Sequence, residues 1–186
     1  PMKGGILGVE NLNKHLQNLF NSNRGKSVKS RLYEYKVADK VIHIKNTNMK
    51  AQTMNMYREG SIDFLEKRIF NGQLGMIIKL DFDEAKAIVL YPNDDIVVFY
   101  DFDELQNLIS LAYCLTIHKT QGMEYDTALI PMTFSHFIMH NTKLLYTAIT
   151  RAKNMCYVVG EEEAFTTACK RIETTKRETV IQDLLG

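Results

Sequence analysis

Hydrophobic and polar residues follow two different spacings in the first half of the chain. Apolar side chains recur at intervals of three and four residues from Val9 to Phe20, which predicts an amphipathic helix whose apolar face packs in the core. Apolar and polar residues alternate over Val37–Lys45, which predicts a strand. Residues 21–30 between them predict a polar loop. Residues 47–67 are polar and rich in methionine, and we expect them to be partly helical toward Ile62.

From Phe70 onward the pattern changes to short apolar runs separated by turn residues. The elements that it predicts are strands beginning at Leu74 and spanning 87–91 and 96–100, with turns at 70–72, 81–84 and 92–95. Several short strands at this spacing are typical of a small β-barrel.

The last third of the chain alternates apolar runs with a helical pattern. Leu111–Ile117 and Thr127–Ile130 have the length and the β-branched content of buried strands. A helix with an apolar stripe is predicted over Lys143–Lys153, and a strand over Met155–Gly160. The three carboxylates of 161–163 suit the positive end of a further helix, whose inward-facing residues we expect to be Phe165, Ala168 and Cys169. The charged residues 171–186 are expected either to form a last helix or to fray.

Composition and charge bound the class of protein. The chain has 186 residues, of which 45% are hydrophobic and 24% charged, so we expect a globular fold with one core and a small insertion. Its formal net charge is only +1, so any contact with nucleic acid must come from a local patch or from a site shared with another domain. There is no signal peptide and no apolar run that could span a membrane, and we expect a cytoplasmic protein. Cys114, Cys156 and Cys169 lack metal-binding spacing and are expected to be buried, reduced thiols.

The loop after the strand expected at 111–117 carries residues suited to bind a phosphate. Strand ends in open α/β sheets are common ligand sites, and this one leads into the sequence HKTQG. Lys119, Thr120 and the backbone N–H groups around Gly122 could hold a phosphate oxygen. The alternative is a solvated surface loop. For Arg151, near the end of the following helix, the alternative is that it only compensates the helix dipole.

Two segments imitate nucleotide-binding motifs without completing them. Gly25-Lys26-Ser27 resembles the end of a phosphate-binding loop, but Phe20 stands where the pattern requires a Gly, and a helix rather than a strand precedes it. Residues 96–104 imitate an apolar strand that ends in magnesium-binding carboxylates. We interpret them as an edge strand followed by an acidic turn in which Asp103 caps the next segment.

Taken together, the loop and the helix carry a family resemblance. IHKTQGMEYD (117–126) followed by LLYTAITRAK (144–153) resembles motifs V and VI of superfamily 1 helicases in order and spacing, in the variant of the RecD-like group that includes RecD and TraA. VADKVIHIKN (37–46) resembles a family segment in which Gly is common at the position of Ala38. FNGQLG (70–75) resembles the opening of an SH3-like insertion, and PMKGGILG (1–8) resembles motif IV.

This resemblance implies an α/β fold. A RecA-like parallel-sheet domain of the P-loop NTPase type, without a P-loop of its own, would comprise residues 1–38 and 110–186. An inserted SH3-like β-barrel would comprise residues 39–109. The resemblance also places a core strand before residue 1, so we expect a fragment of a longer, UvrD-like helicase.

The resemblance implies roles for single residues as well. Arg151 would be an arginine finger that stabilises charge during phosphoryl transfer, with Tyr146 and Thr147 packing against it and orienting it. The residues toward the nucleotide would be Gln121, Gly122, Glu124 and Lys3. The residues near the DNA backbone would be His118, Lys119 and Thr120. No residue is expected to bind a metal.

The activity that follows from the resemblance is that of an ATP-dependent DNA helicase of repair or recombination, similar to the exodeoxyribonuclease V alpha chain. ATP and Mg²⁺ would be bound mainly by an upstream RecA-like domain of the same polypeptide. The motor would move 5′ to 3′ on single- or double-stranded DNA, with RecB- and RecC-like subunits as candidate partners. This chain alone would be inactive.

Two other functions stay open at this point. The chain could be a non-catalytic module that binds nucleic acid or protein, or a viral-type RNA helicase domain. The presence of Arg151 and Lys119 favours a motor over the first. The sequences IHKTQG and FNGQLG favour the bacterial DNA group over the second.

Overall fold

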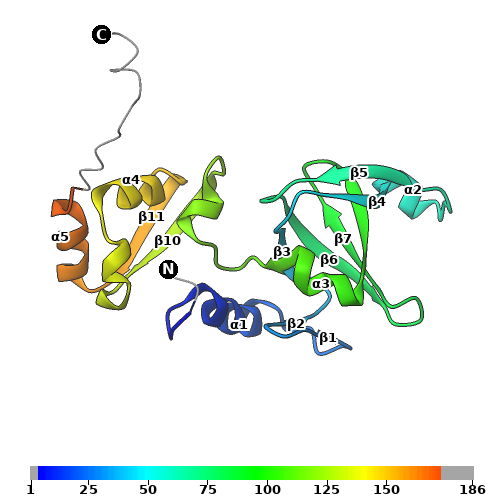
Figure 1. Cartoon of the computed structure of the whole chain (residues 1–186), viewed down its shortest axis with the longest axis horizontal. Coiled ribbons are helices and arrows are strands. Elements are labelled where there is room, and N and C mark those ends of the chain that lie inside the picture. The colour runs from blue at the N-terminus through cyan, green and yellow to red at the C-terminus, as the bar shows by residue number, and fades with distance from the viewer. Residues whose placement is uncertain (1–3, 173–186) are drawn as a thin grey trace, which may run out of the picture. The chain divides into compact units, whose positions relative to one another are not determined.

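The computed structural model describes residues 4–172. The chain forms two compact units, Pro1–Lys119 and Thr120–Gly186 (Figure 1). Lys3, expected at the nucleotide, and residues 173–186, expected to form a last helix or to fray, lie outside the described residues. None of the described helices is long and apolar enough to cross a membrane.

A seven-stranded sheet, antiparallel throughout, is the body of the first unit (Figure 1). In chain order its strands are β3 (Lys40–His43), β4 (Thr47–Thr53), β5 (Leu65–Ile69), β6 (Leu74–Asp81), β7 (Lys86–Tyr91), β8 (Ile96–Asp101) and β9 (Ile109–Leu111). Their order across the sheet is β5-β4-β8-β7-β6-β3-β9. The strands and turns expected between residues 70 and 101 are confirmed.

Residues 47–67 are partly helical as expected, but the helix does not extend to Ile62, and residues 47–53 and 65–67 belong to strands. Only α2 (Met54–Arg58) is helical, and Ile62 is exposed. Alternate residues of β4 are nevertheless buried, among them Met49 and Ala51. The period of two was hidden because flexible Met and small Ala occupy the buried positions, where β-branched residues usually signal a strand.

The glycines of FNGQLG serve two different purposes. Gly72 has a φ of 102°, as the turn before β6 requires. A Cβ on Gly75 would lie 2.8 Å from the side chain of Val89 and 2.9 Å from the carbonyl oxygen of Leu90, so β6 and β7 can approach only because residue 75 lacks a side chain.

The structure of residues 96–104 differs in two details from the expected edge strand and acidic turn. β8 lies between β4 and β7 in the sheet and is not an edge strand. Asp101, not Asp103, is the N-cap residue of α3 (Phe102–Leu108), and Asp103 lies in the first turn. Its carboxylate there suits the positive end of the helix.

The core of the first unit contains a buried chain of polar side chains. The hydroxyl oxygens of Tyr91 and Tyr100 lie 2.6 Å apart, and that of Tyr100 lies 3.0 Å from Nδ1 of His43. All three residues are fully buried. Burial lowers the pKa of His43 to about 4, because the protonated ring would lose its hydration.

The first helix, α1 (Val9–Phe20), has the expected bounds but not the expected orientation. Its buried residues are Asn13 and Gln17, whereas Leu19 and Phe20 are 73% and 70% exposed. The expectation that its apolar stripe packs in the core was therefore wrong.

Buried hydrogen bonds around Asp39 explain that orientation. The Asp39 carboxylate accepts from the side-chain amides of Gln17 (2.6 Å) and Asn21 (2.7 Å), from the hydroxyl of Tyr113 (2.9 Å) and from the backbone N–H of Lys36 (2.7 Å). A fully buried carboxylate must find such donors, so it holds the polar face of α1 against the unit.

The strand expected at 111–117 also differs from the structure. β9 ends at Leu111, residues 112–116 are irregular, and a 3₁₀-helix, η1, spans Ile117–Thr120. The amide of Asn13 donates to the carbonyl of Cys114 and accepts from its N–H, both at 2.9 Å. This side chain supplies the pairing that a neighbouring strand would otherwise give, so the segment needs no ladder.

The second unit is built on a parallel strand pair (Figure 1). β10 (Tyr125–Met132) pairs with β11 (Ala152–Gly160), and the chain between them forms η2 (Phe134–Met139) and α4 (Thr142–Ile149). α5 (Glu162–Lys170) follows, with two Glu in its first turn as expected. A small core of Met132, Leu145 and Ala168 holds these helices to the strands.

The expected burial of the cysteines was wrong. Cys114 and Cys156 are only partly buried, and Cys169 is exposed although Ala168 beside it is buried and Phe165 packs on the same core. On a helix, residues 168 and 169 differ by about 100° in direction, so they cannot both face inward.

Candidate functional site

The loop of the first candidate motif begins with η1 and turns at Gly122. Met123 N–H donates to the carbonyl of Thr120 (3.0 Å), and Gly122 has a φ of 81°, a conformation that costs a residue with a Cβ free energy. Gln121 and Gly122 are exposed in this turn. The carbonyl oxygen of Met123 accepts a hydrogen bond from Arg151.

α4 presents the second candidate motif. The side chain of Asn141 caps the N-terminus of this helix by accepting a hydrogen bond from Leu144 N–H (2.8 Å). Leu145 and Ala148 are the buried residues of the helix. The helix ends at Ile149, so Arg151 lies beyond it rather than within it as expected. The reason is that the carbonyl of Arg151 already accepts from Tyr125 N–H (2.8 Å), which starts the β10–β11 pairing.

Three hydrogen bonds fix the guanidinium of half-buried Arg151. Nη1 donates to the carbonyl of Met123 (3.0 Å), Nε to the carbonyl of Thr147 (3.1 Å), and Nη2 to the hydroxyl of Thr150 (3.3 Å). All three acceptors are uncharged. Among the described residues no carboxylate forms an ion pair with Arg151, so its positive charge is not neutralised there.

An exposed ion pair lies at the edge of the same loop. Lys153 Nζ is 3.2 Å from Glu124 Oε2, and both side chains are more than half exposed. Such a pair contributes roughly 0–1 kcal/mol to stability, so its carboxylate remains accessible to a ligand at little cost.

The second unit thus brings together most of the residues expected at the nucleotide, namely Gln121, Gly122, Glu124 and Arg151. His118 is exposed, and Lys119 and Thr120 are partly buried in η1. Thr147 orients Arg151 through its carbonyl, whereas the side chain of Tyr146 is 70% exposed.

Sequence reasoning did not foresee three groups that contact these residues: the carbonyl of Met123, the hydroxyl of Thr150 and the ammonium of Lys153. A backbone acceptor leaves no signal in side-chain identity. Thr150 and Lys153 flank Arg151 in the motif, and that proximity was the only available hint.

A hollow of about 260 Å³ in the second unit contains none of the expected site residues; it is lined by Met132, Val158, Gly160, Glu161, Glu162 and Phe165. Lys26 and Ser27, which belong to the incomplete phosphate-loop pattern, make contacts within the chain. Lys26 Nζ lies 5.3 Å from the centre of the Phe82 ring, and the Ser27 hydroxyl donates to Glu34.

Two family models match this chain. Residues 12–91 match the ATP-dependent RecD-like DNA helicase SH3 domain, and residues 111–159 match the UvrD-like helicase C-terminal domain. The two matched segments contain the FNGQLG turn and both candidate motifs, so the family resemblance seen in the sequence is confirmed.

Individual relatives agree. The chain is 34% identical over 182 residues to the ATP-dependent RecD2 DNA helicase of Deinococcus radiodurans, an alignment that covers 98% of this chain and 22% of that protein. It is 40% identical over 65 residues to the RecBCD enzyme subunit RecD of Mycobacterium tuberculosis, covering 34% of this chain and 11% of the relative. The corresponding Haemophilus influenzae subunit is 27% identical over 121 residues, 63% of this chain and 16% of the relative. The chain therefore spans less than a quarter of the length of these relatives.

Proposed function

Because the chain carries the UvrD-like helicase C-terminal domain and the SH3 domain of ATP-dependent RecD-like DNA helicases, we propose that it is the second motor domain of such a helicase. In this role it completes, with an upstream RecA-like domain, a site for ATP and Mg²⁺. That upstream domain supplies the phosphate-binding loop and the metal ligands, since the two segments of this chain that imitate such motifs, 25–27 and 96–104, do not complete them.

The observation that supports the proposal most strongly is how the guanidinium of Arg151 is bound. Its guanidinium is held by three uncharged acceptors and has no carboxylate partner among the described residues. An unneutralised, oriented guanidinium is what an arginine finger needs to stabilise negative charge on a γ-phosphate bound by a neighbouring domain.

The hydrogen bond between Arg151 and Met123 supports a coupling role for the loop. When Arg151 shifts toward a phosphate, the carbonyl of Met123 loses or changes a charge-assisted hydrogen bond. The same loop continues into His118, Lys119 and Thr120, which we assign to the DNA backbone. Gln121, Gly122 and Glu124 lie between the two and are assigned to the nucleotide side.

Exposed apolar side chains on the parallel strands support a larger sheet. Leu129, Tyr157 and Val159 are 67%, 52% and 54% exposed, although parallel sheets are usually covered on both faces. We assign these strands to a RecA-like domain made of residues 1–38 and 110–186. Residues 39–109 are then the inserted SH3-like barrel, with Lys3 a further phosphate contact. The proposed motor is inactive without its upstream domain, moves 5′ to 3′ and, in some members, works with RecB- and RecC-like subunits.

The test is DNA-stimulated ATP hydrolysis by the full-length helicase. Replacing Arg151 with Ala should lower kcat by roughly 10³-fold while ATP still binds, because the substitution removes charge stabilisation in the transition state. Lys153→Ala, which removes an exposed, paired cation two residues away, is the matched control and should keep its rate within about threefold. An Arg151→Ala helicase with the wild-type rate would make Arg151 structural and reject the finger.

A further inference from the structure

The sequence from Lys14 to Lys36 concentrates positive charge. This stretch contains six Lys or Arg residues and a single Asp or Glu, Glu34, for a net charge of +5. The entire chain has a net charge of only +1, so the remaining residues carry a net −4. A basic stretch in an otherwise near-neutral chain is the local patch through which such a chain could contact a polyanion.

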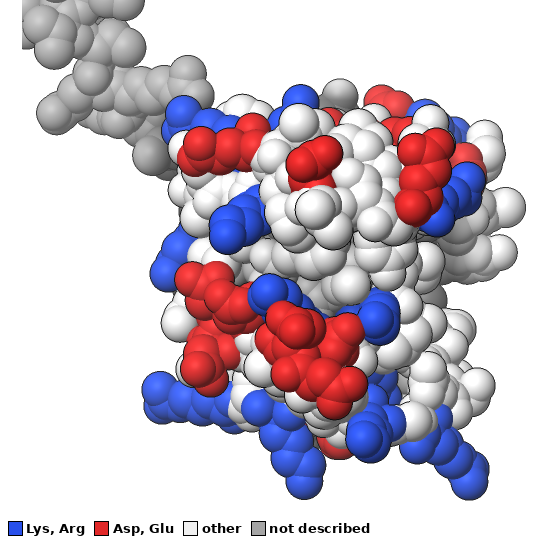
Figure 2. Space-filling model, turned by 90° about the vertical axis from the view of Figure 1, so that its right-hand side faces the viewer, with Lys and Arg blue, Asp and Glu red and all other residues white. Residues whose placement is uncertain are grey.

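The fold turns part of this stretch into a groove. β1 (Val28–Lys29) and β2 (Glu34–Tyr35) form a hairpin beside α1, joined to it where the amide of Gln17 donates to the carbonyl of Glu34 (2.7 Å). The groove between them has a volume of about 320 Å³, and its lining includes Lys14, Lys29, Lys36, Leu32, Tyr33 and Glu34. Figure 2 shows Lys and Arg side chains gathered along the lower edge of the first unit, at the height where Figure 1 places β1 and β2.

The three lysines that line the groove are not neutralised. In the part of the chain that the structure describes, none of Lys14, Lys29 and Lys36 forms an ion pair. Glu34, the one carboxylate of the lining, instead accepts a hydrogen bond from the hydroxyl of Ser27. The lining of the groove therefore combines three lysines that form no ion pair with the exposed apolar side chain of Leu32.

We propose that the groove between α1 and the β1–β2 hairpin binds the phosphate backbone of a single nucleic-acid strand, as a second contact outside the 118–120 loop. A lining of lysines and apolar side chains suits a polymer that alternates phosphates with flat, apolar-faced bases. The identity of the polymer rests on the proposed helicase function, but strand binding here requires neither ATP nor Arg151.

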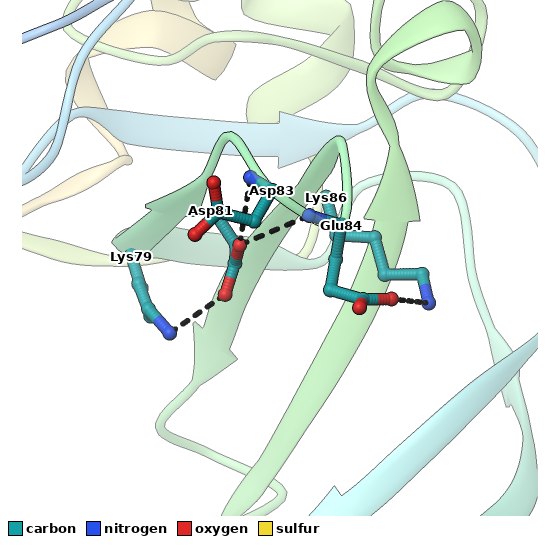
Figure 3. A network of polar contacts seen from close by, with 5 residues as sticks. All are labelled: Lys79, Asp81, Asp83, Glu84 and Lys86. Atoms are coloured by element: carbon teal, nitrogen blue, oxygen red, sulfur yellow. Dashed lines mark hydrogen bonds and ion pairs between the residues drawn. The ribbon is translucent and has the colours of Figure 1, made fainter.

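The control for this proposal comes from two lysines of the same unit that do not line the groove. In the β6–β7 turn, Lys79 Nζ lies 2.8 Å from Asp81 and Lys86 Nζ lies 3.7 Å from Glu84 (Figure 3). Asp81 also accepts from the backbone N–H groups of Asp83 and Glu84 (Figure 3). Because both lysines already have carboxylate partners, removing them changes the net charge as much as removing two groove lysines, without removing a site.

The experiment measures binding of this chain to a fluorescein-labelled oligothymidylate by anisotropy, over a series of salt concentrations and without ATP. The double variant Lys14→Ala/Lys29→Ala should bind on the order of tenfold more weakly at low salt, and its slope of log K against log salt should fall by about 1.4, or about 0.7 for each lost phosphate contact. The control Lys79→Ala/Lys86→Ala should keep the wild-type slope. Thermal unfolding of both variants checks that each is folded.

Two results would overturn the proposal: an unchanged slope in the groove variant, or an equal loss in the control, which would indicate only a response to net charge. The outcome is separate from that of the ATPase test. A groove that binds DNA in a protein whose Arg151→Ala variant keeps its activity would leave this site in place and reject the arginine finger alone.

Discussion

Arg151 donates a hydrogen bond from Nη1 to the carbonyl oxygen of Met123 at 3.0 Å, and this contact links the segment 144–153 to the loop of 117–126. The acceptor belongs to the backbone, so the contact depends on the conformation of the loop and not on the side chain at residue 123. Gly122, with its positive φ, sets that conformation. The backbone hydrogen bond from Tyr125 to Arg151 and the ion pair between Glu124 and Lys153 join the same two segments.

Arg151→Lys separates charge from geometry at this contact. Lysine keeps the positive charge but lacks the planar fork that reaches the carbonyls of Met123 and Thr147 at once. We expect the full-length variant to lose at least about tenfold in DNA-stimulated ATPase activity and to recover only a small part of what Arg151→Ala loses. A lysine variant close to wild type would show that charge alone suffices and that the orienting bonds do not matter.

Gly160 lies at a close approach of β10 and β11. A Cβ at residue 160 would lie 1.9 Å from the carbonyl oxygen of Met132, and φ is 143°. Gly160→Ala should therefore lower the free energy of unfolding of the second unit by roughly 3 kcal/mol, as measured by urea denaturation. Gly122→Ala is the matched control: its φ is also positive, at 81°, but a Cβ there meets nothing within 4 Å, so only about 1 kcal/mol of backbone strain is expected. Equal losses would mean that strain, not the clash, dominates at residue 160.

Ala38 occupies a backbone conformation that favours glycine. Its φ is 70°, in the left-handed region that Gly adopts without the steric cost of a Cβ. Ala38→Gly should stabilise the first unit by about 1 kcal/mol in urea denaturation, because it relieves the left-handed strain. Ala87→Gly, in the buried centre of β7, is the control and should destabilise by a similar amount. Destabilisation by both variants would indicate that unfolded-state entropy outweighs strain at residue 38.

The sequence predicted elements where one period dominates and failed where another force decided. The bounds of α1 and the strands after Phe70 follow from spacing alone. The orientation of α1 does not, because buried Asp39 attracts Gln17 and Asn21 more strongly than the apolar stripe attracts the core. The segment 112–116 looked like a strand because it is apolar, but the amide of Asn13, about a hundred residues earlier, replaces the strand partner. Such long-range polar pairs leave no periodic trace.

The sequence pointed to the residues of the candidate site but not to the contacts that they make. The motif wording identified Arg151 and the loop around Gly122, and the structure brings them together in one unit. The side chain of Tyr146, expected to pack on Arg151, is exposed, because the buried stripe of α4 runs through Leu145 and Ala148. The sequence alone does not show which face of α4 packs on the strands, so it could not place Tyr146 outside the buried stripe.

His43 should make the stability of the first unit depend on pH. Burial lowers the pKa of its imidazole from about 6.5 in the unfolded chain to about 4 in the folded one. Between these values the unfolded chain binds a proton that the folded chain does not. The contribution of His43 is thus fully present above about pH 6.5 and is lost as the pH falls toward 4, by roughly 3 kcal/mol in all. Urea denaturation at pH 7 and pH 5 measures the slope.

The variant His43→Gln isolates this residue from other buried histidines, because burial also lowers the pKa values of His136 and His140 in the second unit. The substitution also removes the hydrogen bond with Tyr100, but that loss shifts the curve equally at both pH values. The difference in unfolding free energy between wild type and variant should therefore shrink as the pH falls. A wild-type slope in the His43 variant would show that folding does not shift the pKa of the buried imidazole.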